Sequence, residues 1–119
     1  MHAPPSTEVV QRLVGAALEL VGFGKFTVHL SFENGNRISF GAPFRFARAN
    51  ELSKASVIEF PLTDSNLVRA LGSTVSDTAC DDDGTLTLTF ANADTLVIYA
   101  NDPMYEAYTL FVDGRKYVV

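Results

Sequence analysis

The sequence predicts an α+β fold, predominantly β, made of two α-β-β-β repeats related by pseudo-two-fold symmetry. Three features predict it: a short helix ending at a glycine, a strand with regular alternation, and a turn after that strand all occur twice in the same order. The repeats cover about residues 6–46 and 63–112. We expect antiparallel sheets packed as a sandwich or a partly open barrel, because each alternating strand has one apolar face to bury.

The spacing of four landmarks supports a duplication. Gly72 follows Gly15 by 57 residues, and Phe90 follows Phe32 by 58 residues. One residue has therefore been inserted between the glycine and the phenylalanine of the second copy. The 119 residues are expected to form a single domain, 1–119, because no linker or low-complexity tract divides them.

A short helix is expected at the start of each copy. The helices and their capping residues are 8–14 after Ser6 or Thr7, and 65–71 after Thr63 or Asp64. The side-chain oxygen of a capping residue accepts a free backbone N–H at the helix start. The glycine that follows each helix tolerates the positive φ at which a helix ends.

Three strands are expected after each helix, at about residues 16–22, 26–32 and 36–41, and then 74–80, 85–90 and 95–100. Apolar and polar residues alternate in the middle strand of each copy, which is typical of a sheet with one buried face. The apolar positions are Phe26, Val28, Leu30 and Phe32, and then Leu86, Leu88 and Phe90. Further strands are expected at about 56–60, 105–112 and 115–119.

Asparagine and aspartate residues mark the turns. Asn34-Gly35 predicts a two-residue hairpin in which both residues adopt positive φ, and Asp113-Gly114 predicts another. Residues 92–94, Asn-Ala-Asp, form a weaker version of the first turn. The run Asp81-Asp82-Asp83-Gly84 differs from a calcium loop, because its carboxylates are consecutive and the next glutamate is Glu106. We predict a solvated turn there, and no metal or cofactor.

The composition favours a small soluble globular domain. The net charge of −5 disfavours binding to nucleic acid or to an anionic membrane, since phosphates would meet a like-charged protein. Cys80 is the only cysteine, no leader sequence is evident, and no apolar run is long enough to span a bilayer. These features predict a cytoplasmic protein in which Cys80 is a small buried apolar group.

Four residues are candidates for a binding site: His29, Tyr105, Glu106 and Tyr108. If Tyr108 faces the core, then Glu106 shares its side of the strand and needs a partner, for which Arg12 and Arg69 are candidates. We therefore expect Glu106 to be at least partly buried.

His29 lies on the polar face of a strand, so it is either part of such a site or an ordinary surface histidine. No GxSxG, HExxH, Walker or GxGxxG motif occurs in the chain, and we therefore expect no catalytic residues.

Two segments of the second half, 83–90 (DGTLTLTF) and 102–108 (DPMYEAY), resemble a family of short, uncharacterised bacterial proteins. The turn at 32–35 (FENG) and the segment 41–44 (GAPF) resemble the same family. The resemblance covers most of the chain, although Tyr108 stands where the family usually has tryptophan. It implies no activity and no catalytic residues, and it suggests an immunity or interaction role in bacterial competition.

Two classes of function remain open from the sequence. The first is a non-enzymatic protein-binding module, of immunity type or otherwise, which acts through an exposed sheet face or edge. The second is a small enzyme or ligand-binding domain with a pocket between the two repeats, lined by the four candidate residues. A homodimer formed through the strand expected at 115–119 is a further prediction, because an exposed sheet edge invites another chain.

Overall fold

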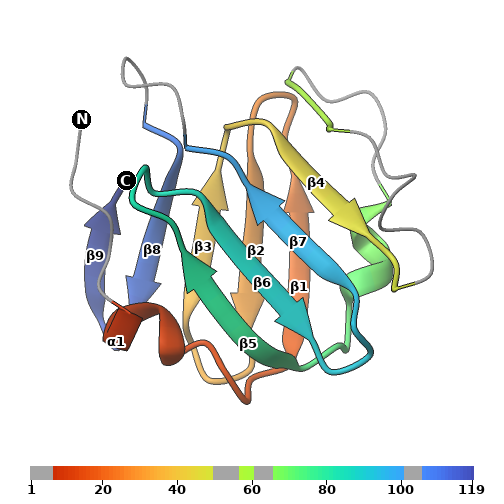
Figure 1. Cartoon of the computed structure of the whole chain (residues 1–119), viewed down its shortest axis with the longest axis vertical. Helices are drawn as coiled ribbons and strands as arrows, with labels where there is room; N and C mark the ends of the chain where they lie inside the picture. Colours follow the sequence, from red (N-terminus) through yellow and green to blue (C-terminus); the bar gives the residue numbers. More distant parts are fainter. Residues whose placement is uncertain (1–6, 50–56, 61–65, 101–105) are drawn as a thin grey trace.

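The computed structural model describes residues 7–49, 57–60, 66–100 and 106–119. Within them the chain forms nine strands, one short α-helix and one 3-10 helix. Figure 1 shows the strands in two stacked layers, each of which is an antiparallel sheet. The predominance of β-structure and the antiparallel pairing are confirmed. Among the described strands neither sheet closes into a barrel.

The more distant layer in Figure 1 has five strands, and the nearer layer has four. In spatial order, the first contains β1 (Leu18–Phe23), β2 (Val28–Phe32), β3 (Arg37–Phe40), β8 (Tyr108–Val112) and β9 (Arg115–Val118). The second contains β4 (Phe44–Ala47), β7 (Thr95–Ile98), β6 (Leu86–Phe90) and β5 (Val75–Cys80). The helices are α1 (Thr7–Gln11), which lies beside β5, and η1 (Leu67–Ala70), which lies beside β1.

Each half of the chain contributes at least one strand to the sheet formed mainly by the other half. Strands β1 to β3 form one meander, after which β4 crosses to pair with β7. Strands β5 to β7 form a second meander, after which β8 crosses to pair with β3. The chain crossings therefore connect the two layers, and the hydrogen bonds of the crossing strands join the two halves of the chain within each sheet.

The starts of β1 and β5 are built alike. An irregularity in strand pairing follows the first residue of each strand. The Gly15 N–H donates to the Val75 carbonyl, and the Gly72 N–H donates to the Leu18 carbonyl, each at 2.8 Å. Both glycines have positive φ, 91° and 83°. The glycines thus end their helical turns as the sequence predicts, and each one also bonds the strand of the other half.

The turn between β2 and β3 is longer than the predicted two-residue hairpin. The Gly35 N–H donates to the Phe32 carbonyl at 3.0 Å, and the Phe32 N–H donates to the Asn36 carbonyl at 2.9 Å. Only Gly35 in this turn has positive φ, 87°, while the Asn34 side chain accepts the Asn36 N–H at 3.1 Å. The prediction of two positive φ values was wrong, because the asparagine side chain closes a three-residue loop instead.

The turn between β6 and β7 repeats this arrangement. The Ala93 N–H donates to the Phe90 carbonyl at 2.8 Å, and the Phe90 N–H donates to the Asp94 carbonyl at 2.9 Å. The Asn92 side chain accepts the Asp94 N–H at 3.1 Å. Ala93 occupies the position of Gly35 and has φ of 70°, a conformation that costs an alanine free energy. The weak turn signal at 92–94 was therefore a real turn.

The core lies between the two sheets. Phe32 and Phe90 are 2% and 1% exposed, which confirms that both were assigned to the correct face. The Phe46 ring packs edge-on against Phe90, with centroids 6.4 Å apart. Val10 and Leu13, in and just after α1, are also buried. The inner faces of both sheets thus form the apolar interior that the alternation predicts.

Several predicted elements differ in the structure. The helix expected at 65–71 is a single 3-10 turn, and Asn66 makes no side-chain cap. The proposed caps Ser6, Thr63 and Asp64 lie outside the described residues. Phe26 is 59% exposed, because β2 begins only at Val28.

The second group of differences concerns the segments around β4. Strand β4 was not among the predicted strands, although Phe44 and Phe46 point inward from it. Among residues 57–60 of the strand expected at 56–60, only Ile58 pairs, in an isolated bridge to Phe44. The short strand β4 is recognisable only from its partners, since four residues give too brief an alternation.

Candidate functional site

The structure describes three of the four predicted site residues: His29, Glu106 and Tyr108. His29 is exposed on the outer side of the five-stranded sheet, and its Nδ1 lies 2.6 Å from Ser39 Oγ on the neighbouring strand. Tyr108 is 2% exposed and points into the core. Tyr105 lies outside the described residues. The expectation that Glu106 is buried was wrong: it is exposed, because β8 begins at Tyr108 and the alternation does not extend back to it.

Tyr108 joins the two sheets by a buried hydrogen bond. Its hydroxyl donates to the Gly84 carbonyl at 2.6 Å and lies 3.6 Å from Cys80 Sγ. Burial raises the pKa of Tyr108 well above its usual value, and the Cys80 thiol adds to the rise. Burial also raises the pKa of Cys80, a rise that the Tyr108 hydrogen bond opposes and that Asp81 and Asp83 reinforce. Both groups therefore stay protonated near neutral pH, which favours a structural role.

The described residues form two hollows, one that contains Glu106 and one that contains Arg12. An open depression of about 190 Å³ follows the seam between β3 and β8, where Ser39 and Thr109 meet Glu106. A groove of about 440 Å³ lies between α1 and the β8–β9 hairpin. In that groove Arg12 is paired with Asp113 at 2.6 Å and lies 3.7 Å from Glu8. The seam depression therefore brings Glu106 near Ser39, the partner of His29.

The outer side of the four-stranded sheet is a further candidate surface, which the sequence did not single out. Register places outward residues in two rows across β4, β7, β6 and β5. We call this surface the threonine face, and its members are Arg45, Ala79, Thr87, Thr89, Thr95, Val97 and Tyr99, the last just after β7. Three of them are threonines, and Val97 and Tyr99 add apolar surface that is half-buried.

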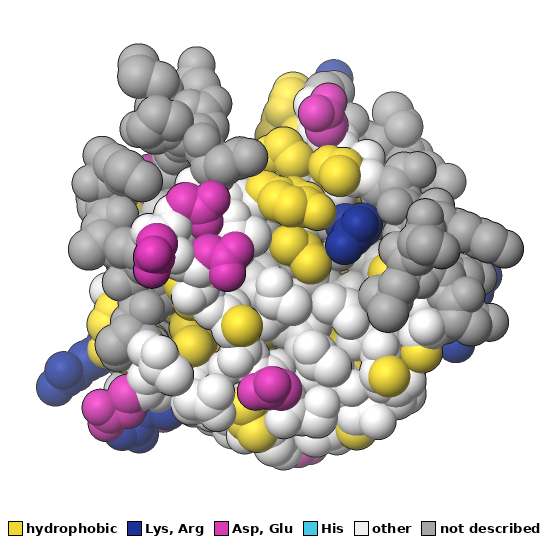
Figure 2. Space-filling model, in the orientation of Figure 1, with side chains coloured by type: hydrophobic (Ala, Val, Ile, Leu, Met, Phe, Trp, Pro, Cys, Tyr) yellow, Lys and Arg dark blue, Asp and Glu magenta, His cyan; other side chains and the backbone are white. Residues whose placement is uncertain are grey.

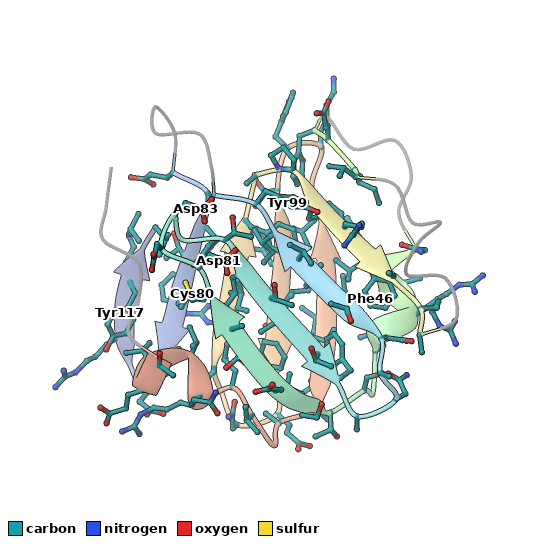
Figure 3. All side chains as sticks on the ribbon, viewed as in Figure 1. Phe46, Cys80, Asp81, Asp83, Tyr99 and Tyr117 are labelled. Carbon is teal, nitrogen blue, oxygen red and sulfur yellow. The ribbon has the colours of Figure 1, made fainter. Side chains whose placement is uncertain are left out.

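Carboxylates line one border of the threonine face. Asp77 lies on β5, and Asp81, Asp82 and Asp83 form the turn that follows it; all four are exposed. Figure 2 shows the acidic side chains beside an apolar patch on this face, and Figure 3 places Asp81, Asp83 and Tyr99 at the same end of the sheet. We call these four residues the acidic border.

The turn that carries the acidic border has a defined geometry. The Asp81 N–H donates to the Thr85 carbonyl at 2.9 Å, and the Gly84 N–H donates to the Asp81 carbonyl at 2.9 Å. The Asp83 carboxylate accepts the Thr85 N–H at 3.0 Å. The predicted solvated turn is thus confirmed. Within the described residues, no group of three or more His, Cys, Asp or Glu is arranged to hold a metal ion.

The threonine face could not be predicted from the sequence, because its residues are distant in the chain. Thr87 and Val97 become neighbours only through the pairing of β6 with β7, and Arg45 joins their row through β4. The polar alternation of β6 was the one available signal. No helix in the described part of the chain is long and apolar enough to cross a membrane.

The fold and these surfaces define a small β protein of two antiparallel sheets. A model of one protein family matches residues 9–119, and the chain belongs to this family, DUF6188, which is a family of unknown function. The resemblance to an uncharacterised family is thereby confirmed. No curated protein and no solved structure matches the chain.

Proposed function

We propose that the protein is a non-enzymatic protein-binding module that captures a basic protein on its threonine face. The observation that carries the proposal is the acidic border beside an apolar patch on the threonine face (Figure 2), a face to which Val97 and Tyr99 belong. Protein interfaces commonly combine an apolar, aromatic centre with a polar rim. A border of four carboxylates suits a partner that offers lysine or arginine beside apolar side chains.

Charge also favours this direction of binding. The chain carries 14 acidic against 9 basic residues, so a basic partner is attracted from a distance before contact. Clustered charge speeds association, and the effect weakens as salt is added. An immunity-type role is consistent with these features, because an inhibitor of a basic toxin gains from rapid capture.

Two further parts of the proposal concern assembly. We propose that residues 1–119 form one domain of two repeats related by a pseudo-two-fold axis, which the matching turns at Gly35 and Ala93 support. We propose a homodimer through β9, which is an edge strand of the five-stranded sheet. Among the described strands only β8 pairs with β9, and the backbone groups of an edge strand can pair with a second copy. Cys80 as the lone cysteine supports a cytoplasmic location.

A second candidate function rests on one contact. The His29–Ser39 hydrogen bond borders the seam depression, which also contains Glu106. A hydroxyl and a carboxylate in one depression, with an imidazole bonded to that hydroxyl from the neighbouring strand, would suit a small polar ligand or a hydrolytic reaction. We rank it second because these groups stand on an open sheet surface, where water competes for every polar contact.

The test uses a partner captured from the source cells on the immobilised protein and then purified. Asp81→Asn, Asp82→Asn and Asp83→Asn together remove three charges but leave an oxygen to accept the Thr85 N–H. We expect about tenfold weaker binding and a smaller dependence on salt.

The matched control is Glu8→Gln, Glu19→Gln and Glu33→Gln, which also removes three negative charges but does so away from the threonine face. Equal losses in the two triple variants would show that only net charge matters and would reject the threonine face as the site. Turnover of a substrate that depends on His29 or Glu106 in a folded variant would favour the second candidate instead.

A further inference from the structure

The outer side of the five-stranded sheet has a different chemistry from the threonine face. Register aligns Ser31, Arg37, Phe111 and Lys116 in one row across β2, β3, β8 and β9. His29, Ser39 and Thr109 form the neighbouring row. We call these seven residues the basic face. His29, Arg37 and Lys116 are exposed, so the described chain leaves the charged positions of this face open to solvent.

Arg37 is held in a defined position on this face. Its guanidinium lies over the Phe111 ring, 4.5 Å from the ring centroid. Stacking of this kind fixes the plane of the guanidinium while its N–H groups remain at the edge of the plane. Lys116 lies directly across from Phe111 on β9. The row therefore offers two cations on either side of one aromatic ring.

The basic face is unusual in a chain of net charge −5. Its acidic neighbours lie at the margins, Glu19 in the irregular start of β1 and Glu106 at the seam depression. The acidic border lies on the other sheet. Charge is thus divided between the two outer surfaces, so that the basic face attracts carboxylates although the whole protein repels them.

We propose that the basic face is a second docking surface, which binds an acidic segment of a partner protein. Planar guanidinium groups bind carboxylates in pairs of hydrogen bonds, and Ser39 and Thr109 supply hydroxyls beside them. A short segment needs only two or three carboxylates to match Arg37, Lys116 and the imidazole of His29. A long nucleic acid is a poorer match, because its phosphates would extend beyond these few cations into the field of an acidic protein. The proposal is independent of the threonine face, and the two together would make the protein a connector between a basic and an acidic partner.

The test is an NMR titration of the ¹⁵N-labelled full chain with a short oligoglutamate peptide. We expect salt-sensitive shifts at His29, Arg37, Thr109 and Lys116, with Thr87 and Thr89 unchanged. Arg37→Gln with Lys116→Gln should weaken binding about tenfold, as expected for the loss of two exposed ion pairs. Lys25→Gln with Arg69→Gln removes two charges elsewhere and should leave the affinity within about twofold.

Two further variants guard against a loss of folding in the Arg37 variant. Lys116→Glu keeps the Arg37–Phe111 stack, and Thr109→Glu places a carboxylate at the centre of the face; both should weaken binding in a chain whose melting is unchanged. Shifts that map elsewhere, no binding, or an equal loss in the Lys25 and Arg69 control would overturn the proposal. Tighter binding of a DNA oligonucleotide of equal charge would also overturn it, because the face would then be a general polyanion site. The titration monitors residues on the sheet opposite the threonine face. A negative result would therefore reject the basic face as a docking surface without affecting the proposed function.

Discussion

Strands β2 and β6 are the middle strands of the two meanders, and they differ almost only on their outer sides. Inward, β2 presents Val28, Leu30 and Phe32, and β6 presents Leu86, Leu88 and Phe90, all of them buried. Outward, β2 presents His29 and Ser31, whereas β6 presents Thr87 and Thr89. The inner residues keep the shape and hydrophobicity that two packed sheets require, and the outer residues differ in chemistry.

The neighbouring strands extend the same contrast. Arg37 and Ser39 point outward from β3, whereas Thr95 and Val97 point outward from β7. The five-stranded sheet thus carries three basic side chains on its outer side, His29, Arg37 and Lys116. The four-stranded sheet carries threonines and one arginine, Arg45, with carboxylates along one edge. The inner positions thus maintain the fold, while the outer positions are free to differ in chemistry.

The largest expected effect tests whether the two inner faces are equivalent. Phe32→Ala and Phe90→Ala should each lower the free energy of unfolding by about 3–5 kcal/mol, because each removes a fully packed ring. Denaturant unfolding followed by circular dichroism measures both. A cost below about 1 kcal/mol for either ring would break the equivalence of the two sheets.

A smaller effect is expected where the two sheets are joined. Tyr108→Phe leaves the buried Gly84 carbonyl without its 2.6 Å hydrogen bond, and should cost about 1–3 kcal/mol. The same unfolding experiment applies. Tyr108→Phe should also leave binding on both outer faces intact. If Tyr108→Phe abolished partner binding in a stable protein, the hydroxyl would belong to a site and not to the fold.

The two equivalent turns allow a reciprocal exchange. Gly35→Ala should destabilise the protein by about 1 kcal/mol, and Ala93→Gly should stabilise it by about as much, because both positions have positive φ. Nothing lies within 4 Å of a Cβ added at Gly35, so backbone conformation alone decides the effect. Changes of the same sign in the two melting curves would show that the turns are not equivalent.

The sequence predicted the inner faces well and the outer surfaces poorly, for a physical reason. Alternation within one strand is a local signal, so the burial of Phe32 and Phe90 could be predicted from their neighbours. The crossings of β4 and β8 depend on long-range pairing, which no short segment encodes. The prediction that Glu106 is at least partly buried was wrong. Strand β8 begins only at Tyr108, which pairs with Phe40, so Glu106 lies before the strand.

The threonine face shows the same limit. The sequence predicted the turn at 81–84 as solvated, which the structure confirms. Its position beside Val97 and Tyr99 follows from the register of β5, β6 and β7, and so it could be seen only in the folded chain.

The smallest effect on stability should accompany the largest effect on binding. Asp81→Asn, Asp82→Asn and Asp83→Asn together should change the free energy of unfolding by less than about 0.5 kcal/mol, because exposed substitutions away from packed groups cost little. A larger loss of stability would mean that the acidic border supports the fold. Weaker binding by this variant could then result from unfolding, and Val97→Asp would serve as a second test of the same face.

Mapping the contact by NMR on the labelled 119-residue chain tests directly the claim that a basic partner binds the threonine face. Addition of the purified partner should shift or broaden the signals of Thr87, Thr89 and the Val97 methyl groups. The signals of His29 and Thr109 should stay unchanged, and the effect should weaken in the triple asparagine variant. Shifts confined to His29 and Thr109, with Thr87, Thr89 and Val97 unaffected, would contradict the claim.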